Sequence, residues 1–119
     1  MSYAIEIISN PNFLEFGDFI NPYDKKPEDI NTNTTKSYFD LANIEIIGDD
    51  NKARLNLFDA KKREFPLVID MLEQHPFSSQ VFLPLGNNPF FVIVCPAAIK
   101  PDLNNLKIFK IENGNGVNF

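Results

Sequence analysis

The sequence predicts an all-β domain, a sandwich or a barrel, with one short helix near its N-terminus. Many short runs are apolar or alternate between apolar and polar residues, which is typical of strands. Clusters of Gly, Pro and Asn separate these runs and suit tight turns. Phe and Ile dominate the positions expected to face inward, and the chain holds 12 Phe. With 119 residues, these features favour a single domain over residues 1–119.

The N-terminal part predicts a strand followed by a helix. Residues 3–8 alternate and suit a strand. Ser9 and Asn10 are N-cap candidates and Pro11 suits the first helical turn, so a helix is expected over 12–16. Gly17 is a natural helix stop. A short extended piece (19–21) and a polar surface loop (22–33) follow.

From Thr34 onward every predicted element is a strand or a turn. Strands are expected over 34–39 and 43–47, then a hairpin turn over 48–51 and a half-buried strand over 53–58. A charged connection leads to four more strand-like runs, with a turn at 85–89 between the second and the third: 67–75, 80–84, 90–95 and 106–111. Residues 67–73 also fit a helix, and periodicity does not decide between the two.

Composition and charge limit the partners that this protein can have. The formal net charge is -5 and the pI about 4.7, which argues against nucleic acid and anionic membranes because both attract basic surfaces. Cys95 is the only cysteine, so a disulfide framework is excluded and a reducing cytoplasm is expected. Neither a secretory signal nor an apolar run long enough to span a bilayer is visible. We therefore expect a cytoplasmic protein that binds neither nucleic acid nor a membrane.

His75 is the only histidine, and histidine is the side chain best suited to proton transfer near neutral pH. On a strand, Glu73 and His75 would share one face, with Gln80 on the neighbouring strand facing them. Imidazole and carboxylate together are common ligands for Ni, Mn, Fe or Zn. A histidine before a proline is more often a turn or a capped core residue, so a metal site and a structural role both stay open.

A second polar group surrounds residues 31–38. The amides and hydroxyls of residues 31–34 would suit a small ligand rich in hydrogen-bonding groups, although a solvated loop is the commoner case. Lys36 is a candidate partner for a substrate carboxylate, or simply an exposed lysine. Tyr38 is a candidate for holding a substrate oxygen, or a core residue with a hydrated hydroxyl.

Several kinds of chemistry find no support in the sequence. Gly114-Asn115-Gly116 lies near the end of the sequence and no helix is predicted after it, so it is not a phosphate-binding loop. No CxxC or HxxxH pair is present. Cys95 sits in an apolar run and is expected to be an inert thiol. Ser78 and Ser79 follow His75 closely, but no nucleophile elbow surrounds them.

Five stretches, in order and spacing, are similar to those of one enzyme family: FLEFGDFI (13–20), IN to YFDLA (30–42), MLEQHPFSSQVFLP (71–84), FFVIVCP (90–96), and KPD to GNGVN (100–118). Together they resemble the ureidoglycolate lyases, which are cupin-fold enzymes. The stretch over 71–84 is the most specific of the five.

The resemblance implies a cupin-like β-barrel, a homodimer, and cleavage of (S)-ureidoglycolate to glyoxylate and urea in allantoin and purine degradation. It also implies a divalent metal such as Ni²⁺. It points to His75 and Glu73 as catalytic residues, and to these two with Gln80 as metal ligands. For substrate binding it points to Gln80, Asn31, Tyr38 and Lys36.

The sequence also departs from the family pattern. Asn33, Ser37, Phe39, Gln74 and Phe119 stand where the family has glycine, arginine, histidine, arginine and tyrosine. The family pattern continues beyond the position of Phe119 with a histidine-bearing segment, so the barrel is expected to be incomplete at its C-terminus. Two alternatives to an active enzyme therefore stay open: a catalytically inactive, truncated cupin, and a small-molecule-binding module. A sugar-binding or regulatory cupin has only fold analogy behind it.

Overall fold

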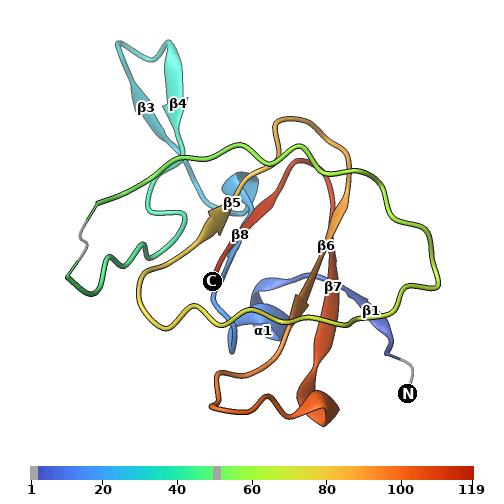
Figure 1. The fold of residues 1–119 in the computed structure, drawn as a ribbon. Helices are drawn as coiled ribbons and strands as arrows, with labels where there is room; N and C mark the ends of the chain where they lie inside the picture. Colours follow the sequence, from blue (N-terminus) through green and yellow to red (C-terminus); the bar gives the residue numbers. More distant parts are fainter. Residues whose placement is uncertain (1–2, 50–51) are drawn as a thin grey trace.

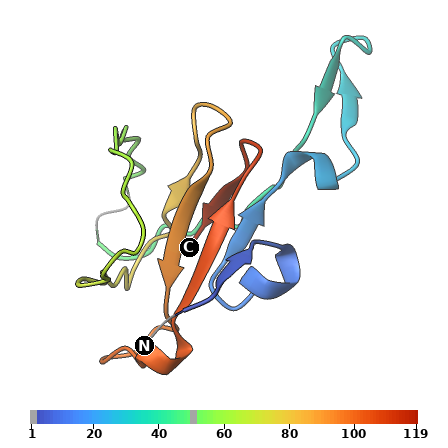
Figure 2. The same ribbon diagram turned by 90° about the vertical axis from the view of Figure 1, so that its right-hand side faces the viewer.

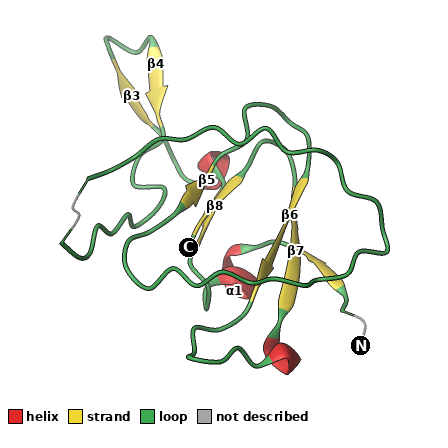
Figure 3. Ribbon diagram, in the orientation of Figure 1, coloured by secondary structure: helices red, strands yellow, loops and turns green. Residues whose placement is uncertain are grey.

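The computed structural model describes residues 3–49 and 52–119; its regular structure is mostly β-strand with little helix, and long loops connect the strands (Figure 3). Its strands are β1 (Ile5–Ile7), β2 (Asp18–Ile20), β3 (Glu28–Ile30), β4 (Thr35–Ser37), β5 (Val81–Phe82), β6 (Phe90–Val94), β7 (Lys107–Ile111) and β8 (Gly116–Asn118). Helix α1 spans Asn10–Phe13, and 3-10 turns span Pro22–Asp24 and Leu103–Asn105. The all-β prediction is therefore confirmed in its coarse form.

The strands form two three-stranded sheets and a separate hairpin. One sheet has the order β1-β7-β6, with β1 parallel and β6 antiparallel to β7. The other has the order β2-β8-β5 and is antiparallel. Strands β3 and β4 pair only with each other and project from the body (Figure 1). Within the described residues, the sheets do not close into a barrel.

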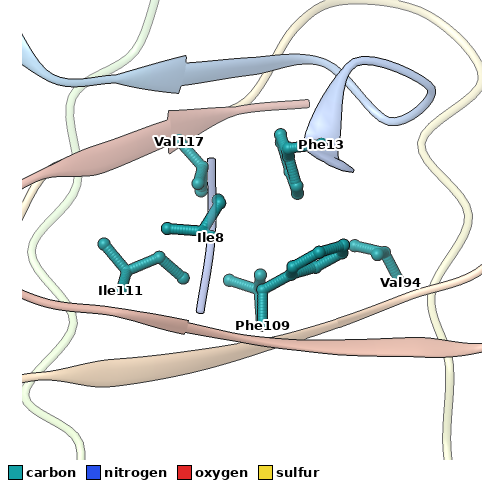
Figure 4. Close-up of a cluster of buried hydrophobic side chains, with 7 residues drawn as sticks. Ile8, Phe13, Val94, Phe109, Ile111 and Val117 are labelled. Atoms are coloured by element: carbon teal, nitrogen blue, oxygen red, sulfur yellow. The ribbon is translucent and has the colours of Figure 1, made fainter. Parts of the chain in front are cut away.

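Aromatic side chains hold the two sheets and α1 together. Phe13 of α1 and Phe109 of β7 are fully buried, and their rings pack edge to face with centroids 5.3 Å apart. Val117 of β8, Ile111 of β7 and Ile8 surround them (Figure 4). Edge-to-face contacts add to the large apolar area that each ring buries. This cluster fixes β7, β8 and α1 relative to one another.

The start of α1 follows from a capping box. The Asn12 N–H donates to Ser9 Oγ at 3.3 Å, and the Ser9 N–H donates to Asn12 Oδ1 at 2.8 Å. Pro11 lies in the first turn, where no backbone donor is needed. The predicted helix over 12–16 is therefore present, but it begins two residues earlier and ends at Phe13.

Residues 52–76, which we call the strap, run past the sheets as an extended loop (Figures 1 and 2). The strands predicted over 43–47, 53–58 and 67–75 are wrong, because none of these segments joins a sheet ladder in the described structure. The half-burial predicted for 53–58 is also wrong, since Leu55 is 99% exposed and Leu57 is 76% exposed. Alternation alone does not make a strand when no neighbouring backbone supplies hydrogen bonds.

The other expectations fare better. Strands over 3–8, 34–39, 80–84, 90–95 and 106–111 are confirmed with shorter bounds, and the extended piece at 19–21 corresponds to β2. The turn at 85–89 does connect β5 to β6. The loop over 22–33 contains a 3-10 turn and β3, and the sequence did not predict β8. The hairpin turn at 48–51 lies partly outside the described residues.

Candidate functional site

A surface cleft of about 600 Å³ lies where the backbone of residues 47–49 meets that of residues 75–78. Its lining consists of Ile47, Gly48, Asp49, His75, Pro76, Phe77 and Ser78. The cleft combines an imidazole, a carboxylate and a hydroxyl with apolar surface. It therefore offers groups for proton transfer beside a place where a small polar molecule can sit.

Glu73 and His75 lie side by side at this cleft. Glu73 Oε2 is 3.6 Å from His75 Nε2, and the two side chains are 66% and 45% exposed. The predicted proximity is confirmed, although these residues belong to the strap and not to a strand. Both side chains are exposed, so solvent screens the pair and it adds little to the stability of the fold.

Two serine hydroxyls fix residues 45–47, which lead into the wall of the cleft formed by residues 47–49. Ser78 Oγ accepts a hydrogen bond from the Ile47 N–H at 2.9 Å and donates one to the Ile47 carbonyl at 3.1 Å. One step earlier, the Glu45 N–H donates to Ser79 Oγ at 2.9 Å, and the Ser79 N–H donates to the Glu45 carbonyl at 2.8 Å. Residues 45–47 therefore lie along residues 78–79 as a strand would, but two serine hydroxyls take part in the bonding.

Gly48 allows the backbone that follows Ile47 to turn toward the cleft. Gly48 has φ +105°, a backbone conformation that other residues rarely adopt. The Phe77 ring lies beside it, with its nearest atom 3.6 Å from where a Cβ on Gly48 would be. Asp49 follows and lines the cleft. Asp49 was predicted only as part of a turn, because no local sequence pattern shows which distant residues share a cleft.

A buried polar group anchors the beginning of the same wall to the sheet. Asp18 Oδ2 accepts hydrogen bonds from the Asn43 N–H at 2.8 Å and from Asn118 Nδ2 at 3.0 Å. Asn118 Nδ2 also donates to the Asn43 carbonyl at 2.9 Å. Asn118 is only 2% exposed, and its Oδ1 is buried without a partner. Two strands of one sheet, β2 and β8, thus hold both backbone groups of Asn43.

The other predicted site residues do not join this cleft. Asn31 lies at the tip of the β3–β4 hairpin with φ +53°, and Lys36 is exposed on β4. The Tyr38 ring packs edge to face against the Tyr23 ring, with centroids 5.2 Å apart. Gln80 exchanges two backbone hydrogen bonds with Phe119 and does not line the cleft. Of the predicted set, the structure brings together only Glu73 and His75.

The expected metal ligands do not form a closed set. Across residues 3–49 and 52–119, no three His, Cys, Asp or Glu side chains gather closely enough to hold a metal ion. Glu73 and His75 supply two ligands, whereas a catalytic metal usually has three from the protein. Of the three ligands that the resemblance implies, Glu73 and His75 lie together, whereas Gln80 does not line the cleft.

Comparison with known proteins agrees with the sequence motifs. A profile of the ureidoglycolate lyase family matches residues 2–119. The chain belongs to the ureidoglycolate lyase family. It is 36% identical over 116 residues to a ureidoglycolate lyase of Stutzerimonas stutzeri, covering 98% of this chain and 68% of that protein. A ureidoglycolate lyase of Pseudomonas aeruginosa is 37% identical over 115 residues, covering 97% and 68%, and one of Burkholderia mallei is 35% identical over 116 residues, covering 98% and 68%.

Family membership draws attention to the segment around His75. Glu73, His75 and Ser78 lie within the stretch that carries the most specific resemblance, and they also border the cleft or pair with a residue that does. In a ureidoglycolate lyase family member this coincidence makes the His75 cleft the candidate active site. Among the residues that the structure describes, no helix has the length and apolar character needed to cross a membrane.

Proposed function

We propose that this protein is a ureidoglycolate lyase that cleaves (S)-ureidoglycolate to glyoxylate and urea, as a step of allantoin and purine degradation. The observation that carries the proposal is the His75–Glu73 pair, 3.6 Å apart at the edge of a cleft of about 600 Å³. Membership of the family supports the choice of substrate. The cleft supplies the one kind of group that this reaction requires, a proton carrier that works near neutral pH.

The reaction moves one proton and breaks one C–N bond. Neutral His75 takes the proton of the substrate hydroxyl, and the oxygen forms the aldehyde C=O of glyoxylate. The electrons of the broken C–N bond go to the urea nitrogen, which receives the proton back from the imidazolium. Glu73 stabilises the imidazolium between the two transfers. Asp49 and Ser78 border the space in which the substrate would lie.

The test is the release of urea and glyoxylate from racemic ureidoglycolate by the purified protein. We expect a rate above the spontaneous one, with consumption of a single enantiomer. His75→Gln should lower kcat by about 10²-fold or more, because it keeps polarity but removes the proton carrier. Gln74→Ala, on an exposed neighbour, is the matched control and should keep kcat within about twofold.

The outcomes separate the alternatives. Equal rates for His75→Gln and the wild type would remove His75 from the mechanism. Glyoxylate binding without turnover in a folded wild-type protein would instead identify a small-molecule-binding module. Neither binding nor turnover would identify an inactive cupin.

We also propose, from the family resemblance, that a divalent metal such as Ni²⁺ binds this protein and that Glu73, His75 and Gln80 are its ligands. No step above depends on them. Activity that disappears with EDTA and returns with Ni²⁺ or Mn²⁺ would establish a metal requirement. Roles for Asn31, Lys36 and Tyr38 in substrate binding are tested in the same assay, where alanine at each should raise KM.

We also propose a cytoplasmic homodimer of single-domain, cupin-like subunits. The accessible surface is 9811 Å², whereas a compact chain of 13.6 kDa has about 6,600 Å². The radius of gyration is 16.2 Å, against about 13.5 Å for a compact domain of this length. The excess surface, about 3,200 Å², is ample for a dimer, which buries about 800 Å² per subunit in a standard interface. Analytical ultracentrifugation tests this: a monomer at micromolar concentration contradicts the proposal.

A further inference from the structure

We propose that Ser78 is a positioning residue: its hydroxyl sets the wall of the His75 cleft formed by residues 47–49, and thereby the affinity for substrate. The proposal rests on the function proposed above. Ser78 is not a nucleophile in this arrangement, because its hydroxyl is engaged on both sides by Ile47. The oxygen accepts from the Ile47 N–H at 2.9 Å and donates to the Ile47 carbonyl at 3.1 Å.

The wall depends on these bonds because, in the described part of the chain, the segment leading to it joins no sheet. Segment 43–47 is outside every described sheet ladder, so its backbone groups are satisfied by side chains and by the Ser79 amide. At its far end, Asn43 is fixed to β2 and β8 through Asp18 and Asn118. At its near end, the Ser78 hydroxyl bonds both the N–H and the carbonyl of Ile47. Gly48 and Asp49 come directly afterwards.

The effect of Ser78 passes to the ligand through these next two residues. Gly48 has φ +105° and packs beside the Phe77 ring. The position of the Asp49 backbone therefore depends on the position of Ile47, two residues earlier. Asp49 and His75 both line the cleft, and they belong to the two different segments that Ser78 and Ile47 connect. Loosening Ile47 would therefore change the width of the cleft. The imidazole itself would stay in place, because it belongs to the other segment.

The experiment compares Ser78→Ala, Ser78→Thr and Ser37→Ala with the wild type. Ser78→Thr keeps a hydroxyl. Ser37 lies on the β3–β4 hairpin and serves as the serine control. Each protein is titrated with glyoxylate, assayed for kcat and KM, and examined by NMR at one fixed pH. Because His75 is the only histidine, its imidazole gives a single Hε1 signal, and the Asp49 amide reports on the wall.

Ser78→Ala removes both hydrogen bonds to Ile47, and we expect it to weaken glyoxylate binding and to raise KM by about fivefold or more, with kcat within about twofold. Its Asp49 amide signal should shift, whereas Ser78→Thr and Ser37→Ala should resemble the wild type. A merely structural role would lower kcat and the folded fraction together and would not be rescued by threonine.

Two results would overturn the proposal: unchanged Kd and KM in Ser78→Ala, or an equal fall in kcat for both Ser78 variants. If the wild type neither binds glyoxylate nor turns over substrate, the proposed function fails and the binding claim fails with it. The claim that the Ser78 hydroxyl positions residues 47–49 is then decided by the NMR experiment alone. A shift of the Asp49 amide confined to Ser78→Ala supports it, and no shift refutes it.

Discussion

Replacing Asn118 by aspartate tests whether the buried contact that anchors the cleft wall exists. Asn118 Nδ2 lies 3.0 Å from Asp18 Oδ2 and 2.9 Å from the Asn43 carbonyl, and the residue is 2% exposed. Asn118→Asp replaces the Nδ2 amide, which donates to Asp18 and to the Asn43 carbonyl, by a carboxylate oxygen that can only accept. Two hydrogen bonds worth about 1 kcal/mol each are lost.

The added charge is the larger effect. Two carboxylates about 3 Å apart repel by about 5 kcal/mol at an effective dielectric constant of 20. Small movements and water relieve part of this, so we expect the free energy of unfolding to fall by about 3–5 kcal/mol at pH 7, counting the lost bonds. At pH 3.5 the loss should shrink, because protonation removes the repulsion and restores a donor.

Urea unfolding followed by circular dichroism measures this loss at both pH values. Asn56→Asp, on an exposed part of the strap, is the matched control and should change stability by less than about 0.5 kcal/mol. A loss below about 1 kcal/mol at pH 7, or one that is the same at pH 3.5, would refute the Asp18–Asn118 contact as the anchor of Asn43.

Four further substitutions, of which Gly86→Ala is a control, test the core, a close backbone approach and the helix cap, all by urea unfolding. Phe109→Ala removes a fully buried ring that contacts Phe13 and should cost about 3–5 kcal/mol; a cost below about 1 kcal/mol would contradict the core. Gly17→Ala places a Cβ 1.9 Å from the Asn118 carbonyl oxygen and should be strongly destabilising. Gly86→Ala meets nothing within 4 Å and should be near neutral, so equal effects would contradict the close approach at Gly17. Ser9→Ala removes the capping box and should cost about 1 kcal/mol; no loss would show that the cap does not matter.

The parts of the fold that the sequence predicted are those with strong local signals. Ser9 and Pro11 mark the start of α1, and the apolar run over 90–95 marks β6 whatever it pairs with. The parts that failed depend on distant partners. Residues 53–58 alternate like a strand, but they join no sheet in the described structure. Strand β8 follows a glycine-rich turn and reads as loop, yet it pairs with β2 about 100 residues earlier.

The same division explains the candidate site. Glu73 and His75 were predicted together because they are two positions apart, so that either a strand or an extended loop keeps them close. Asp49 could not be predicted as their neighbour, because its place depends on hydrogen bonds between segments about 30 residues apart. Asn31, Lys36 and Tyr38 were grouped by composition, and the hairpin geometry carries them away from the cleft.

The distribution of stabilising contacts suggests how the cleft works. The sheets are held by backbone ladders and a buried aromatic cluster, whereas the cleft wall is held by side-chain bonds at Asn43, Glu45 and Ile47. Segments held by few bonds open at low free-energy cost without unfolding the rest. The scaffold and the cleft wall can therefore differ in stability, and a ligand that contacts both Asp49 and His75 would order the wall most of all. A rigid core with a wall anchored by Asp18 and Asn118 at one end and Ser78 at the other is an arrangement in which binding affinity can change without loss of the fold.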